Sequence, residues 1–126
     1  MSRHPERVQD YLEHILEAIE RIQRYTAGKS VEEFEADTLI QDAVLRNLSI
    51  VGEAARRLMA DAPEFVSAHP EIPVAKIYAT RNRITHAYEE VDLKIVWNLV
   101  AFDAPDLKAK VAVALERLRQ DGENAR

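Results

Sequence analysis

The stretch VQDYLEHILEAIERIQRY, residues 8–25, decides the fold class because its apolar side chains recur with the period of an α-helix. Val8, Leu12, Ile15, Ile19 and Ile22 follow one another at alternating steps of four and three residues. Further apolar residues widen this stripe on both sides: Tyr11, Leu16, Ala18 and Tyr25. A stripe of this width is typical of a helix in a bundle rather than of a two-stranded coiled coil.

Start and stop signals divide the rest of the chain into further helices. The first helix begins at Pro5 and ends at Ala27-Gly28, Ser30 and Glu33 form a capping box for a short helix, and Asp37 caps a long one that contains Gly52. Because an interior glycine costs about 1 kcal/mol relative to alanine, we expect another helix to pack closely at Gly52.

The second half of the chain continues the helical pattern, with no segment of strand period. The predicted segments are a brief helix from Pro63, a helix from 73 or 74 to about 88, a helix that Asp92 caps and Pro105 interrupts, and a helix from about Leu107 to a polar tail after about Asp121. The chain is therefore predicted to be a single all-α domain over 1–126, an up-and-down bundle of four to five helices.

Composition excludes several classes of protein. With no cysteine, the chain cannot form disulfides, cysteine zinc sites or a catalytic thiol, which also fits a reducing cytoplasm. No apolar run reaches the roughly 20 residues that span a bilayer, and the polar N-terminus is unlike a signal peptide. We therefore expect a soluble cytoplasmic protein. Its net charge of −5 means that any nucleic-acid binding must use a local basic patch.

Residues 76–88 form such a basic patch. They contain one lysine, two arginines and no acid, which gives a formal charge of +3. Their last eight residues, RNRITHAY, combine Arg81, Asn82, His86 and Tyr88. An arginine fork binds phosphate, and histidine can take and give a proton near neutral pH. This combination is what metal-free RNA cleavage needs, because a 2′-hydroxyl must lose a proton, the phosphorane must be stabilised and the 5′ oxygen must regain a proton.

Helical geometry separates the two principal side chains of this segment. At 100° per residue, Arg81 and Tyr88 lie about 20° apart, whereas Arg81 and His86 lie about 140° apart. One straight helix therefore does not aim Arg81 and His86 at the same atom. Either the helix loosens near Thr85, or a second copy of the segment completes the site in a two-fold dimer.

Each of these residues also has a purely structural interpretation. Lys76 and Arg83 are typical of solvated charges on a helix. His86 alone is typical of a hydrogen-bonded, half-buried histidine, and Tyr88 of a ring packed under a loop.

Polar residues elsewhere give weaker signals. Arg46, Asn47 and Glu53 stand among apolar residues of the long helix, which favours buried or interfacial pairing between helices. The remaining histidines, His4, His14 and His69, have no spacing to acidic residues that indicates a metal site. We therefore expect no bound metal.

Two parts of the chain together resemble a known family. Arg81-x4-His86-x-Tyr88, with Asn82 after the arginine, resembles the R-x(4–6)-H-x-Y pattern of HEPN ribonucleases. Residues 42–55, DAVLRNLSIVGEAA, are similar to the second-helix signature of the HepT-like branch of that superfamily. Residues 91–97 and 103–107 also lie where that family has similar segments, so the likeness covers roughly residues 11–118.

This resemblance implies the toxin of a type VII-like HEPN/MNT toxin–antitoxin system: a metal-independent endoribonuclease without a cofactor, which forms a homodimer with the motif at its interface. The implied antitoxin is an MNT-type nucleotidyltransferase, which in some members adds AMP to the motif tyrosine, here Tyr88. By the same resemblance, Arg81 stabilises the phosphate, His86 is the acid and base, and Asn82 orients the site. Arg46 and Glu53 are implied as supporting residues.

Two functions of other classes stay open on the sequence. The chain could be a binding module in which Arg81 and His86 hold a nucleotide without cleaving it. It could also be a structural dimeric partner that anchors a nucleotidyltransferase. Toxicity that disappears when His86 alone is changed would favour the ribonuclease over both.

Overall fold

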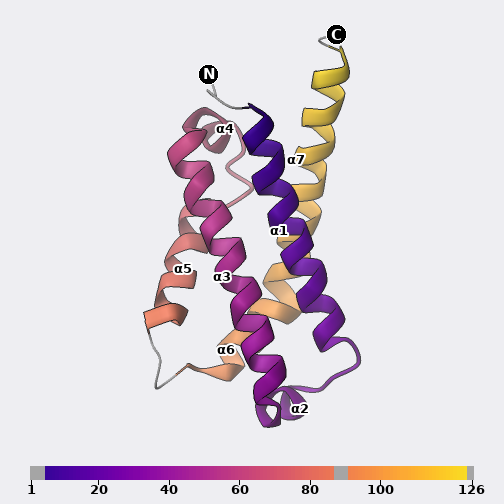
Figure 1. The fold of residues 1–126 in the computed structure, drawn as a ribbon, viewed down its shortest axis with the longest axis vertical. Coiled ribbons are helices and arrows are strands. Elements are labelled where there is room, and N and C mark those ends of the chain that lie inside the picture. The colour runs from indigo at the N-terminus through magenta and orange to yellow at the C-terminus, as the bar shows by residue number, and fades with distance from the viewer. Residues whose placement is uncertain (1–4, 87–90, 125–126) are drawn as a thin grey trace.

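The computed structural model describes residues 5–86 and 91–124, with side chains over 7–84 and 91–123, and this part of the chain is helical with no strand. Four long helices run alternately down and up (Figure 1): α1 (Pro5–Thr26), α3 (Thr38–Asp61), α5 (Val74–His86) and α7 (Ala104–Asn124). Three short helices lie near the ends of the bundle: α2 (Val31–Ala36), α4 (Pro63–Ala68) and α6 (Leu93–Asn98). The predicted all-α, up-and-down bundle is confirmed.

Helix α1 lies between α3 and α7 and packs against both (Figure 1). The five residues of its predicted apolar stripe are each at most 2% exposed: Val8, Leu12, Ile15, Ile19 and Ile22. Full burial of one such side chain stabilises the fold by about 1.5–3 kcal/mol, so α1 is a main contributor to the core. No helix in the described part of the chain is long and apolar enough to cross a membrane.

The helix ends follow the predicted signals. Gly28 comes just after α1 with a φ of 73°, in the left-handed region that favours glycine. The hydroxyl of Ser30 accepts a hydrogen bond from the backbone of Glu33, whose carboxylate accepts one from the backbone of Ser30. The carboxylates of Asp37 and Asp92 cap α3 and α6. Because each cap satisfies backbone groups within a few residues of itself, these boundaries can be predicted from the sequence.

The prediction that Pro105 interrupts a helix is wrong. Helix α6 continues through a π-helical turn, η1 (Leu99–Asp103), directly into α7, and Pro105 lies in the first turn of α7. Proline has no N–H to donate, and in a continuous α-helix its ring clashes with the carbonyl four residues earlier. The wider turn just before Pro105, in which hydrogen bonds span five residues, relieves that conflict without a break. At its other end α7 remains helical to Asn124, beyond the predicted start of the tail at Asp121.

Helix α5, which carries the candidate motif, begins at Val74, a buried member of the larger core cluster, and is attached to the core at two further points. Ile77 packs against the same cluster, to which α1, α3, α4 and α7 also contribute. Ile84, two helical turns later, packs against a smaller cluster that includes Phe34 and Val44. Two anchors on one face determine which way the other faces of α5 point.

Asn47 is a buried polar residue that links α1 to α3. Its side chain is 4% exposed, its Oδ1 accepts a hydrogen bond of 2.7 Å from Nε of Arg21, and its Nδ2 donates one of 2.8 Å to the carbonyl of Ala43. The predicted pairing between helices is therefore confirmed for Asn47. A buried amide with all these bonds made avoids the penalty of a desolvated, unpaired polar group.

Replacement of this amide should measurably destabilise the bundle. We expect Asn47→Ala to lower the free energy of unfolding by about 2 kcal/mol, because the guanidinium of Arg21 loses its acceptor and a small cavity opens. Urea unfolding followed by circular dichroism measures the change. The neighbouring exposed residue offers a matched control, since Arg46→Ala should stay within about 0.5 kcal/mol. Equal losses of unfolding free energy in the two variants would contradict the structural role of Asn47.

Candidate functional site

The candidate site lies where α5 packs against α3. Here the side chain of Arg81 contacts α3 at Gly52. A Cβ atom built on Gly52 would stand 2.4 Å from Cβ of Arg81, 2.3 Å from its Cγ and 3.1 Å from its Cδ. The expectation that another helix packs closely at Gly52 is confirmed, and the atoms that do so belong to the motif arginine.

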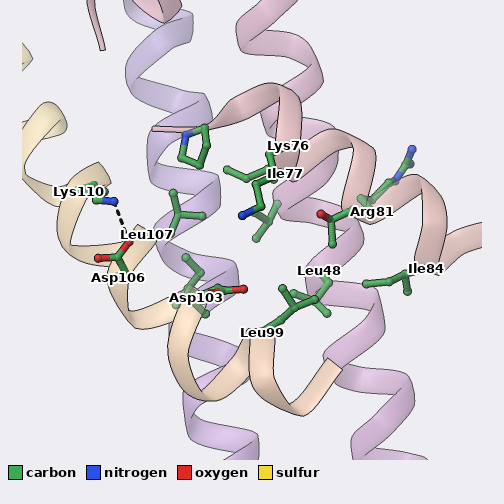
Figure 2. Close-up of a pocket in the computed structure, with 15 residues that line it drawn as sticks. Leu48, Lys76, Ile77, Arg81, Ile84, Leu99, Asp103, Asp106, Leu107 and Lys110 are labelled. Atoms are coloured by element: carbon green, nitrogen blue, oxygen red, sulfur yellow. Dashed lines mark ion pairs between the residues drawn. The ribbon is translucent and has the colours of Figure 1, made fainter. Parts of the chain in front are cut away.

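The guanidinium of Arg81 is held at its outer end. Its Nη1 donates a hydrogen bond of 3.0 Å to Oδ1 of Asn82, whereas its Nε is buried and has no hydrogen-bond partner in the described part of the chain. Figure 2 shows the guanidinium extending away from the neighbouring pocket. The terminal nitrogens are thus the part of Arg81 that can reach a phosphate, and the contact with Asn82 agrees with an orienting role for that residue.

Of the two remaining motif residues, the structure describes only the backbone of His86. His86 is the last residue of α5, and its side chain is outside the described residues, as is all of Tyr88. Helix α5 is α-helical throughout, Thr85 included. Five residues of regular helix place positions 81 and 86 about 140° apart around the helix axis. The helix therefore does not loosen at Thr85, which was one of the two alternatives that the sequence left open.

Neither of the two supporting residues implied on α3 forms a hydrogen bond or an ion pair with Arg81. Arg46 is exposed. Glu53 binds Arg56 and Arg57 on its own helix, with its Oε1 2.7 Å from Nη2 of Arg56 and 3.3 Å from Nε of Arg57. The hydrogen bond from Arg56 lowers the pKa of Glu53. The role of Arg46 and Glu53 in the site stays a prediction.

The two other basic residues of the segment are surface charges. Lys76 and Arg83 are both exposed, as expected for solvated charges on a helix. Arg83 follows the motif arginine by two residues, so it lies on another side of α5 and offers a matched comparison for Arg81.

A pocket of about 250 Å³ opens beside the motif, between α5 on one side and η1 and α7 on the other. Its lining is mostly apolar and includes Ile77, Leu99 and Leu107. Five charged side chains, three basic and two acidic, also contribute to it: Lys76, Arg81, Asp103, Asp106 and Lys110. Lys110 is already paired with Asp106 at 2.8 Å (Figure 2).

Sequence reasoning missed this pocket and the contact partner of Gly52. The glycine in the middle of α3 was the available signal for a close approach, but it could not identify the approaching residue. In the described part of the chain no group of three or more histidine, aspartate or glutamate side chains could hold a metal ion.

Comparison with known proteins gives one family. The family model described as ribonuclease HepT-like matches residues 15–114 of this chain. This range contains α3, Gly52, Arg81 and the rest of the motif through Tyr88. No solved structure matches the chain significantly.

Several curated proteins are similar along most of this chain. A protein of Thermococcus cleftensis named "Probable ribonuclease HepT" is 41% identical over 88% of this chain and 94% of its own length. A "Putative RNase" of Caldanaerobacter subterraneus subsp. tengcongensis is 33% identical over 85% of this chain and 93% of its own length. A Methanocaldococcus jannaschii protein named "Gamma-glutamylcyclotransferase and putative RNase" is 36% identical over 93% of this chain, but this chain spans only 51% of its length.

Proposed function

Because this chain belongs to the ribonuclease HepT-like family, we propose that it is a metal-independent endoribonuclease and the toxin of a type VII-like HEPN/MNT toxin–antitoxin system. Ribonuclease activity is the part of this function that the family name states. The observation that carries the finer proposal is the state of Arg81, whose terminal nitrogens stand clear of the pocket while Gly52 and Asn82 hold the rest of the side chain.

The proposed reaction is an internal transfer at phosphorus. A neutral imidazole of His86 takes the proton of the 2′-hydroxyl, whose oxygen then attacks the adjacent phosphorus. The guanidinium of Arg81 stabilises the charge that develops on the phosphoryl oxygens. The bond from phosphorus to the 5′ oxygen breaks, and an imidazolium of His86 protonates the leaving oxygen. The products are a 2′,3′-cyclic phosphate and a 5′-hydroxyl end.

RNA cleavage should proceed in EDTA and should depend on both motif residues. We expect His86→Ala to slow cleavage by about 10²–10⁴-fold through loss of proton transfer, and Arg81→Ala by about 10²–10³-fold through loss of charge stabilisation. Gel assays of labelled RNA with end-group analysis measure the rate and the cyclic phosphate. Arg83→Ala, an exposed arginine of the same helix, should keep nearly the full rate.

Other outcomes of this assay would favour the two alternative functions. Nucleotide binding without cleavage, lost in Arg81→Ala, would indicate a binding module. No cleavage and no nucleotide binding, together with a stable complex with a nucleotidyltransferase, would indicate a structural partner. Cleavage that EDTA abolishes and magnesium restores would contradict the metal-independent mechanism.

We propose that the working form is a two-fold homodimer in which two copies of α5 face each other. The regular helix between Arg81 and His86 supports this, because the two positions stand about 140° apart around the axis of one helix. In a two-fold pair, the arginine of one copy can meet the histidine of the other.

Light scattering at micromolar concentration should therefore report twice the mass of the chain. Mixing Arg81→Ala with His86→Ala should restore part of the cleavage lost in each alone, because a mixed dimer has one site with both residues intact. A monomer that cleaves RNA at the full rate would contradict the shared site. Arg83→Ala mixed with His86→Ala gives the level expected from simple dilution of active chains.

The proposed antitoxin is an MNT-type nucleotidyltransferase that adds AMP to Tyr88. If the helix continued to Tyr88, this residue would stand about 20° from Arg81 around the helix axis, two turns further on. A phosphodiester-linked AMP brings a negative charge and acceptor oxygens, which an arginine fork binds well. The adduct would occupy the phosphate-binding position and exclude RNA.

Co-expression with the nucleotidyltransferase should add the mass of one or more AMP groups to the intact protein. Peptide mass spectrometry should locate the addition to Tyr88, and Tyr88→Phe should abolish it. The modified protein should no longer cleave RNA. A protein that is neutralised without any gain in mass would show instead that the antitoxin acts by steric binding.

A further inference from the structure

Gly52 leaves a space on α3 that the side chain of Arg81 fills. A Cβ at this position would stand 2.4 Å from Cβ, 2.3 Å from Cγ and 3.1 Å from Cδ of Arg81. Carbon atoms that are not bonded to each other pack at about 3.5–4.0 Å. Three consecutive carbons of the arginine therefore occupy the volume that any other residue at position 52 would need.

Rotation of the Arg81 side chain cannot relieve such a contact. Torsions about its bonds move Cγ and Cδ, but Cβ is bonded directly to the backbone of α5. To bring two Cβ atoms from 2.4 Å to a normal separation, α5 itself must move away from α3 by about 1 Å. Gly52 thus sets both the path of the Arg81 side chain and the spacing of the two helices at the motif.

The contact also determines which nitrogens of Arg81 are available. With its carbons seated on Gly52, Nε is buried without a partner in the described part of the chain, and Nη1 reaches Oδ1 of Asn82. The terminal nitrogens are therefore the part of the guanidinium that a ligand can reach. Without the contact with Gly52, the side chain of Arg81 would sample several rotamers, and its terminal nitrogens would no longer have a fixed direction.

We propose that Gly52 is a positioning residue for Arg81, which it holds with its terminal nitrogens directed toward the substrate phosphate. The effect on cleavage rests on the proposed ribonuclease function, whereas the effect on the position of Arg81 does not. Gly52 touches no reacting atom and acts only through the arginine.

The experiment compares Gly52→Ala with Gly122→Ala. Both glycines lie inside helices, but a Cβ on Gly122 would meet no atom within 4 Å. We expect Gly52→Ala to slow RNA cleavage by about 100-fold at temperatures at which circular dichroism shows it folded, since a misplacement of about 1 Å has effects of that size. Gly122→Ala should cleave at the parent rate. A folded Gly52→Ala protein with the parent rate would overturn the proposal.

A double variant separates positioning from general destabilisation. In an Arg81→Gly background the contact has no Cβ, Cγ or Cδ to meet, so adding Gly52→Ala should cost no further cleavage and no further thermal stability. If Gly52→Ala alone fails to fold, this background should restore folding. A full additional loss of cleavage in the double variant, or its failure to fold while Arg81→Gly folds, would overturn the proposal.

An NMR measurement tests whether Gly52 positions Arg81 even if the parent protein cleaves no RNA. The Nε–Hε group of Arg81 is buried, so its NMR signal should exchange slowly with water in the parent and in Gly122→Ala. In Gly52→Ala the signal should shift and exchange faster. An unchanged signal would show that Gly52 does not hold the arginine, whereas absent cleavage with a changed signal would count against the ribonuclease function alone.

Discussion

The close approach of α5 to α3 at Gly52 is the constraint on which the candidate site depends. Helix α5 carries Arg81, Asn82 and His86, and its contacts on the side facing α7 are replaced in part by a pocket. Its position is therefore set chiefly by α3 and by its apolar anchors, Val74, Ile77 and Ile84. Because the interior of a protein is close-packed, a single added carbon at Gly52 is enough to move the whole motif.

Polar residues of α3 have different roles because the helix presents them to different surroundings. Asn47 faces α1, is buried, and forms hydrogen bonds through both its side-chain oxygen and its side-chain nitrogen. Arg46 next to it is exposed, and Glu53 is held by two arginines on its own helix. Neighbouring residues on a helix point about 100° apart, so a structural amide and a solvated charge can be adjacent in sequence without sharing any interaction.

The basic segment of α5 contrasts with the rest of a chain whose net charge is −5. The pocket beside it is lined by three basic and two acidic side chains, and the guanidinium of Arg81 extends away from it (Figure 2). The regular helix between Arg81 and His86 is the observation on which the proposed dimer rests.

Much of the fold could be predicted because its signals act over a few residues. The apolar stripe of α1, the capping box of Ser30 and Glu33, and the caps by Asp37 and Asp92 all work within one or two helical turns. The motif residues could also be recognised from their types and spacing. Pro105 was misjudged because its effect depends on whether the preceding turn can widen, which packing of η1 and α7 decides rather than proline itself.

The sequence by itself determined the helices, their caps, the all-α class and the candidate residues for phosphate and proton chemistry, because each depends on local geometry or on intrinsic side-chain properties. Only the tertiary structure decided that Gly52 receives Arg81 and that Asn47 pairs with Arg21. The contacts of Glu53 with Arg56 and Arg57 lie within one turn of its own helix and are local. Residues 52 and 81 are far apart along the chain, and local propensity says nothing about which side chains meet when two helices pack. Close packing of the interior determines these contacts, because the space beside a small residue is filled by a residue that the fold brings there from a distant part of the chain.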